Sequence, residues 1–103
     1  MDTHFLNSIE GFQWDEGNRG KNLKHDVEQG EIEQVFFNTP VVVLTDVDHS
    51  TEELRWKILG KTANSRFLII VFTIRKQMIR PISARAMNKR ERTFYEEEVK
   101  KNT

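Results

Sequence analysis

The sequence has no cysteine among its 103 residues. This absence excludes a disulfide framework, a thiolate nucleophile and a cysteine-ligated zinc site. Long apolar runs are also missing, because the longest covers only residues 67–72 and is too short to cross a bilayer as a helix. The first residues lack the basic and then apolar layout of a signal peptide. We therefore expect a cytoplasmic protein that makes no membrane contact.

Several motifs of known enzymes are absent as well. The chain has no glycine-rich loop for a phosphate, no nucleophile elbow and no zinc-ligand spacing. Asp46, Asp48 and His49 superficially resemble metal ligands, but no further ligand is fixed beside them, and a polar turn explains them better. We expect neither a metal nor another cofactor.

The hydrophobic pattern predicts one α+β domain over residues 1–103, and it begins with two helices. The first is expected at 16–25, with Asp15 as its N-cap and Asn18 three residues further on. The second is expected at 31–37, where apolar residues recur at the i, i+3, i+4 spacing. Asn88 is expected to cap a last helix at 89–101, again with a capping residue, Glu91, three positions on.

Between the second and last helices the apolar period changes to two, which is typical of strands. Four strands are expected, at residues 41–44, 55–61, 66–75 and 78–85. Their short connections predict an antiparallel meander with 66–75 in a central position. Pro81 indicates a sheet edge or a bulge, and strict alternation would place Arg80 on one face and Arg85 on the other. Helices on one face of the sheet would leave the other face available for a ligand.

Acidic and basic residues are unevenly distributed along the chain. Residues 1–54 hold twelve acidic and three basic residues, whereas residues 55–95 hold eleven basic residues and one acidic residue. One explanation is a surface that binds a polyanion such as RNA. The alternative is that the two halves form ion pairs with each other across the fold.

The candidate site residues follow from this basic segment. Arginine matches phosphate oxygens with its planar fork and stays charged, which favours phosphate binding and stabilisation of developing negative charge. His25 could act as an acid or a base, or it could simply follow the first helix as a capping residue. The Tyr95 hydroxyl could orient or protonate a phosphate, or the ring could serve only for packing.

Five segments, in this order, resemble the BrnT family of toxins. The shared segments are Phe12-Gln13-Trp14-Asp15 with Asn22-Leu23-Lys24-His25, Gly60-Lys61-Thr62, Val71-Phe72-Thr73-Ile74-Arg75, Ile79-Arg80-Pro81-Ile82-Ser83-Ala84-Arg85 and Glu91-Arg92-Thr93-Phe94-Tyr95. They extend from Phe12 to Tyr95 and so cover most of the chain. Each segment alone is weak evidence, and the order of all five makes the resemblance specific.

This resemblance implies a RelE-like fold and metal-independent cleavage of RNA by a toxin of a type II toxin–antitoxin pair. It also implies a DNA-binding ribbon-helix-helix antitoxin, BrnA, in a heterotetramer that contacts operator DNA through the antitoxin. The implied catalytic residues are Arg75, Arg80, Arg85, His25 and Tyr95, with Lys61 as the alternative to His25 for the general base. The basic strands also suggest RNA contacts by Arg55, Lys57, Lys61 and Arg66.

Two departures from the family pattern leave a second hypothesis open. Asp26 stands where the family has glycine after the histidine, and Pro81 stands where it has a β-branched residue. Either change could weaken catalysis and leave a binding module that serves as antitoxin partner and co-repressor. A plain nucleic-acid-binding domain is a third interpretation, and its binding would weaken steeply with salt.

Overall fold

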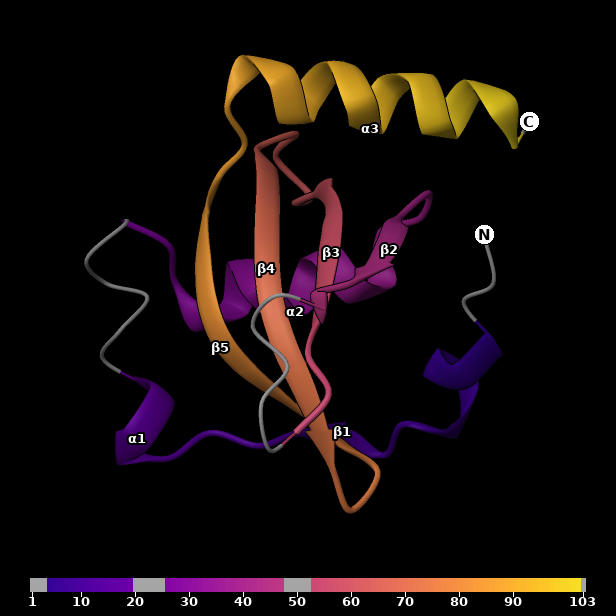
Figure 1. The fold of residues 1–103 in the computed structure, drawn as a ribbon. Helices are drawn as coiled ribbons and strands as arrows, with labels where there is room; N and C mark the ends of the chain where they lie inside the picture. The colour runs from indigo at the N-terminus through magenta and orange to yellow at the C-terminus, as the bar shows by residue number, and fades with distance from the viewer. Residues whose placement is uncertain (1–3, 20–25, 48–52, 103) are drawn as a thin grey trace.

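The computed structural model describes residues 4–19, 26–47 and 53–102, which form one α+β unit built on a single sheet. Figure 1 shows the sheet with helix α2 behind it and helix α3 across one end. The helical elements are η1 (His4–Ser8), α1 (Glu16–Arg19), α2 (Gln29–Phe37) and α3 (Lys89–Lys101). The strands are β1 (Gly11–Phe12), β2 (Val42–Thr45), β3 (Trp56–Lys61), β4 (Phe67–Arg75) and β5 (Met78–Ala86).

The sheet has the strand order β1-β5-β4-β3-β2. Strands β2 to β5 form the predicted antiparallel meander, with β4 inside the sheet. The prediction of four strands was incomplete, because the two-residue strand β1 adds to β5 in parallel. A pairing of two residues across such a long sequence separation leaves no periodic signal in the sequence.

The two longer helices cover opposite faces of the sheet. Ile32, Val35 and Phe36 of α2 pack with Ile70 and Phe72 of β4 in the larger core cluster. A smaller cluster on the other face forms where Tyr95 of α3 packs on a second set of strand residues, namely Val42, Leu59 and Ile69. The expectation that the helices share one face was therefore wrong. Helix α3 lies over one end of its face, and no other helix of the described residues covers the rest of that face (Figure 1).

The predicted N-caps of α1 and α3 agree with the structure, whereas α2 begins at Gln29, two residues before its predicted start at 31. At α1, the Asp15 carboxylate accepts from the Gly17 N–H at 2.8 Å and the Asn18 side chain accepts from the Asp15 N–H at 2.9 Å. At α3 the capping box is reciprocal: the Asn88 side chain accepts from the Glu91 N–H at 2.8 Å, and the Glu91 carboxylate accepts from the Asn88 N–H at 2.9 Å. The first helix is described only to Arg19, and residues 20–25 of its predicted range lie outside the described part.

None of the helices in the described ranges has the length and apolar composition needed to cross a membrane. Within the same ranges, no group of three or more histidine, aspartate or glutamate side chains is arranged to hold a metal ion. Asp48 and His49 lie outside those ranges.

Candidate functional site

A β-bulge in β5 determines which arginines share a face. Ser83 and Arg85 pair with Val71 and Ile69 of β4, but Arg80 pairs with Thr73, so the register shifts by one residue between the two sets of pairs. The extra residue in β5 is Ile82. Paired residues in an antiparallel ladder point to the same side. Arg80 therefore lies on the same face as Arg85, and the prediction from strict alternation was wrong.

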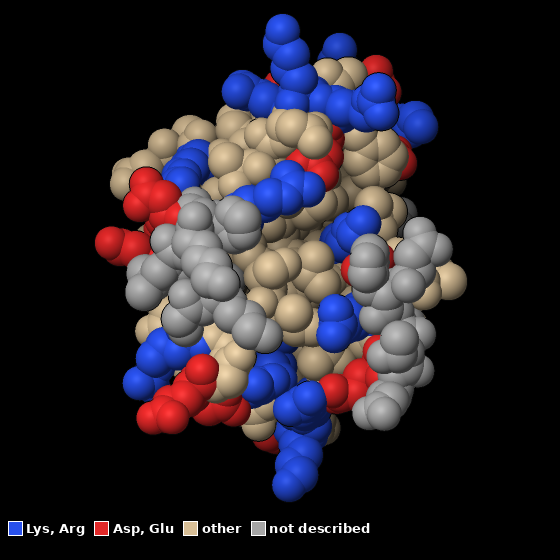
Figure 2. All heavy atoms as spheres, turned by 60° about the vertical axis from the view of Figure 1, so that its left-hand side comes forward, with Lys and Arg blue, Asp and Glu red and all other residues tan. Residues whose placement is uncertain are grey.

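This shared face is the open one, and cations line it. Lys57 of β3 pairs with Val71, which pairs in turn with Ser83, so one row across the sheet carries an ammonium and a hydroxyl. The next rows carry Arg80 and Arg85. Figure 2 shows the side of the molecule where β5 lies, with lysine and arginine side chains around a hollow whose floor is mostly uncharged. We call this region the open sheet face.

Arg80 is held in a fixed position by the segment before α1. Its Nη1 donates to Asp15 Oδ2 at 2.7 Å and to Gln13 Oε1 at 3.1 Å, and its Nη2 donates to Asp15 Oδ1 at 3.0 Å. The Arg80 side chain is only 13% exposed. Fork-to-fork pairing of this kind fixes the plane of the guanidinium as well as its place. The hydrogen bonds from Arg80 lower the pKa of the Asp15 carboxyl below its ordinary value.

Two residues of α1 allow this contact. Asn18 is buried, and its amide donates to the backbone oxygens of Gln13 at 3.0 Å and Pro81 at 2.9 Å, which ties α1 to β5. A Cβ at Gly17 would lie 2.9 Å from Arg80 Nη2, closer than real contacts allow. The absence of a side chain at position 17 therefore leaves room for the guanidinium.

Arg85 and Arg75 also have carboxylate partners. Arg85 donates to both oxygens of Glu91, at 2.7 and 2.8 Å, and Arg75 donates through Nε to Glu53 at 2.8 Å. Hydrogen bonds from these arginines lower the pKa of Glu91 and of Glu53. Both arginine side chains remain close to half exposed, so solvent or a ligand reaches them.

Four ion pairs among the described residues join the acidic first half of the chain to the basic second half. They are Asp15–Arg80, Glu31–Arg66, Asp46–Lys57 and Glu53–Arg75. The pairing of the two halves is thus observed. It does not exclude a polyanion, because most of the cations named here lie on one open face.

The remaining predicted RNA contacts are Arg66, Lys61 and Arg55, of which Arg66 is paired on the other side of the sheet. Arg66 pairs with Glu31 of α2, on the side away from the open sheet face, at 2.9 and 3.0 Å. Lys61 follows buried Leu59 along β3, and its Nζ lies 5.8 Å from the centre of the Phe67 ring. Arg55 immediately precedes β3, and its carbonyl accepts from the Asp46 N–H at 2.8 Å.

Tyr95 is a core residue, 3% exposed. Its hydroxyl donates to the Pro40 carbonyl at 2.7 Å, and burial raises the pKa of the phenol. The structure therefore agrees with the packing alternative for Tyr95 and does not bring its hydroxyl to the arginines. His25 lies outside the described residues.

Sequence reasoning missed the acceptors that orient the arginines. Gln13 and Glu53 received no role, and Asp15 and Glu91 were expected only as helix caps. The sequence contained one usable signal, since Gln13 and Asp15 stand within a segment that resembles the toxin family. The partner of each acceptor depends on the tertiary fold and could not be read from spacing.

A small α+β domain with orientated arginines on an open sheet face is suited to binding phosphate groups. A family model described as ribonuclease toxin, BrnT, of type II toxin-antitoxin system matches residues 14–91. The match covers more than half of the chain, and the chain therefore belongs to this family. No curated protein matches it. Membership of a toxin–antitoxin family implies an antitoxin as partner.

Proposed function

We propose that the protein is a metal-independent endoribonuclease that holds the scissile phosphate of RNA on the open sheet face. The observation that carries the proposal is the register shift at Ile82, which puts Arg80 and Arg85 on one side of β5. Arg75, at the end of β4, adds a third guanidinium on this side. Lys57 and Lys61, on the same face of β3, and Arg55 just before that strand would contact neighbouring phosphates. Arg66 is not given this role, because it pairs with Glu31 on the α2 side of the sheet.

The proposed reaction is an internal transfer at phosphorus. The ribose 2′-hydroxyl loses its proton to a base, and its oxygen forms a bond to the adjacent phosphorus. The bond from phosphorus to the 5′-oxygen breaks, and that oxygen takes up a proton from solvent. The products are a 2′,3′-cyclic phosphate and a 5′-hydroxyl. Negative charge builds up on the phosphate oxygens in between, and fixed guanidinium groups stabilise it.

His25 is the proposed base. The pKa values of Asp15, Glu53 and Glu91 are lowered by their arginine partners, which makes these carboxylates weak bases near neutral pH. Imidazole, by contrast, has an ordinary pKa close to neutrality. Asp15 is proposed as a positioning residue that orients Arg80. Tyr95 is not given the role of acid, because its hydroxyl is bound to Pro40 in the core.

A cleavage assay tests the proposal. Antitoxin-free protein is incubated with end-labelled RNA in excess EDTA, together with the Arg80→Ala/Arg85→Ala double variant. Arg66→Ala is the matched control, since Arg66 is also paired with a glutamate but on the other side of the sheet. We expect cyclic-phosphate ends from the wild type and from Arg66→Ala, and none from the double variant. Equal cleavage by all three would place the site elsewhere.

A second function is favoured by the pairing of all three arginines. The carboxylates of Asp15, Glu53 and Glu91 already accept the guanidinium hydrogen bonds that a phosphate would need. A protein in which these pairs persist would bind its antitoxin without cleaving RNA, and would act as a co-repressor within a heterotetramer with a BrnA-like ribbon-helix-helix partner. Operator DNA would then be contacted only through the antitoxin. A stable complex without cleavage by the wild type would favour this alternative.

A further inference from the structure

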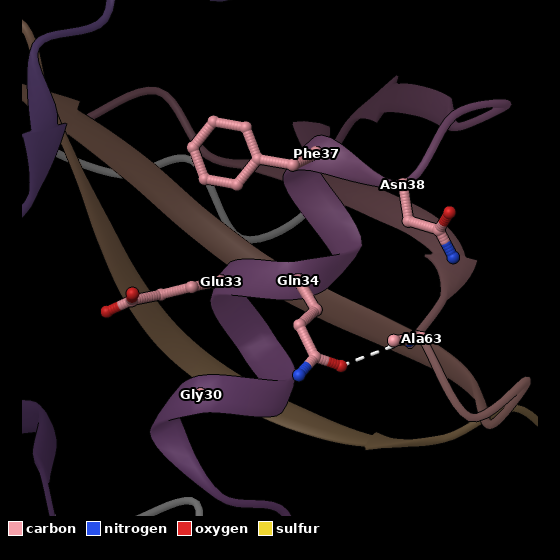
Figure 3. Close-up of a pocket in the computed structure, with 6 residues that line it drawn as sticks. All are labelled: Gly30, Glu33, Gln34, Phe37, Asn38 and Ala63. Carbon is pink, nitrogen blue, oxygen red and sulfur yellow. Dashed lines mark hydrogen bonds between the residues drawn. The ribbon is translucent and has the colours of Figure 1, made fainter.

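Phe37, the last residue of α2, is a large apolar side chain exposed to solvent. It is 78% exposed, whereas the preceding Phe36 is buried at 8%. In Figure 3 the Phe37 ring points away from the helix axis. Its ring meets the edge of Phe12, with centroids 6.0 Å apart, so the exposed ring is supported from one side and is held in place.

Two hollows flank this ring. The first, shown in Figure 3, is lined by Gly30, Glu33, Gln34, Phe37, Asn38 and Ala63. The second includes Leu6, Ile9, Phe12 and Ile79 beside Phe37. A projecting aromatic ring between two concave regions offers both a knob and two holes to a partner. A scattered surface apolar residue would offer neither.

The charge around these hollows is almost entirely negative. Glu33 lines the first hollow and Glu10 the second. A third hollow adjoins the first at Gly30 and is lined by three further acids, Asp26, Glu28 and Glu31. Arg66 is the one cation among the described residues lining the three hollows, and Glu31 neutralises it. We call Phe37, its two flanking hollows and the carboxylates of Glu10 and Glu33 the α2 surface.

We propose that the α2 surface docks a segment of the antitoxin that carries a large apolar side chain between lysines or arginines. The negative surroundings repel RNA and DNA and favour a cationic protein segment. Glu33 is already fixed, because it accepts from Trp14 Nε1 at 2.8 Å, so its carboxylate is orientated before the partner arrives.

This contact is separate from the open sheet face, because α2 packs on the other side of the sheet. It rests on the antitoxin partnership in the proposed function, but not on ribonuclease activity. A second copy of this chain is a poorer occupant. The described cations that could meet the negative α2 surface lie mostly on the open sheet face, so the two copies would pair through different faces. Head-to-tail contacts of that kind do not close into a dimer.

The test is titration of the purified, full-length cognate antitoxin into antitoxin-free protein by calorimetry. We expect Phe37→Ala to raise the dissociation constant at least about tenfold, as loss of an aromatic anchor does. We expect Glu10→Gln/Glu33→Gln to weaken binding at low salt and to match the wild type at high salt. Glutamine at position 33 still offers an oxygen to Trp14, so this variant removes charge and keeps the fold.

Phe94→Ala is the matched control, because Phe94 is another exposed phenylalanine but lies on α3. It should bind the antitoxin as the wild type does. Unchanged affinity of Phe37→Ala would overturn the proposal, and so would a wild-type dimer that Phe37→Ala converts to a monomer in light scattering. Phe37→Ala should cleave RNA as the wild type does, and joint loss of cleavage and binding would also overturn it. If the wild type does not cleave RNA, the binding result still decides the question.

Discussion

Arg80 and Asp15 are 65 residues apart in the sequence, and they are joined by two hydrogen bonds of 2.7 and 3.0 Å. The pair connects the N-cap of α1 to the bulged strand β5. It gives Arg80 one orientation on the open sheet face, which is what a phosphate-binding arginine needs before its substrate arrives. The pair also occupies the guanidinium edge that a phosphate would use, and experiment can separate these two effects.

Asp15→Asn tests which effect dominates. Asparagine keeps an oxygen for Arg80 and Gly17 but removes the charge, so Arg80 should be held less firmly. We expect kcat for RNA cleavage to fall by roughly tenfold with KM little changed, as for the loss of an interaction that matters mainly in the transition state. Steady-state kinetics measures both parameters. Faster cleavage or tighter RNA binding would instead show that Asp15 competes with the phosphate.

Gly17→Ala perturbs the Arg80–Asp15 pair without removing either side chain, because a Cβ at position 17 would also lie 3.1 Å from Asp15 Oδ1. The new methyl group would lie 2.9 Å from Arg80 Nη2, and the flexible guanidinium should move aside while the fold persists. We expect reduced cleavage with a nearly unchanged thermal midpoint. Gly30→Ala is the matched control, since nothing lies within 4 Å of a Cβ there. It should keep cleavage and raise stability by up to about 1 kcal/mol through helix propensity.

Stability should fall at acid pH partly through Glu91. Hydrogen bonds from Arg85 lower the pKa of Glu91 in the folded protein below its ordinary value of 4.5. The folded state therefore binds this proton less readily than the unfolded state, and the stabilisation is present above about pH 4.5 and lost as pH falls through the lowered pKa. Thermal unfolding midpoints measured from neutral to acid pH should show the loss.

Glu91→Gln should make that pH dependence shallower, because glutamine does not titrate and can still serve in the capping box. Glu97→Gln, on the exposed side of the same helix, is the control and should leave the wild-type slope. Equal slopes for all three proteins would show that Glu91 contributes nothing to the acid transition.

Tyr95→Phe separates packing from chemistry. Removing the hydroxyl leaves the Pro40 carbonyl without its donor, which should lower the free energy of unfolding by about 1 kcal/mol. Because the hydroxyl does not reach the arginines, RNA cleavage should persist at the wild-type rate. Denaturant unfolding and the cleavage assay give the two values. Loss of cleavage in a stably folded Tyr95→Phe protein would return Tyr95 to the list of catalytic residues.

The elements predicted well are those with strong local signals. The apolar spacing at Ile32, Val35 and Phe36 corresponds to α2, and Asn88 and Glu91 cap α3 as expected. The run through β4 is apolar on both sides where α2 packs on Ile70 and Phe72 and α3 packs on Ile69. Pro81 indicated an edge or a bulge, and the register shift begins beside it.

The features that were missed depend on contacts between distant segments. No pattern in the sequence identifies Ile82 as the bulged residue, and one extra residue reverses the side on which Arg80 lies. Glu53 and Arg75 can be matched only once β3 and β4 are placed side by side. Charge counting identified the basic segment, but it could not show that carboxylates from the first half sit among its arginines.

The short strand β1 has a kinetic consequence. The meander from β2 to β5 forms through hairpins between neighbouring segments, whereas β1 and α1 must close a long chain loop to reach β5, which costs more entropy. Few backbone bonds hold this segment, among them Glu10 N–H to Gln77 and Gln13 N–H to Ile79, at 2.8 and 2.7 Å. It should assemble last and exchange its amide protons faster than the strands of the meander. Local opening of the amino-terminal segment would therefore carry Asp15 away from Arg80, while the sheet that carries the arginines stays folded.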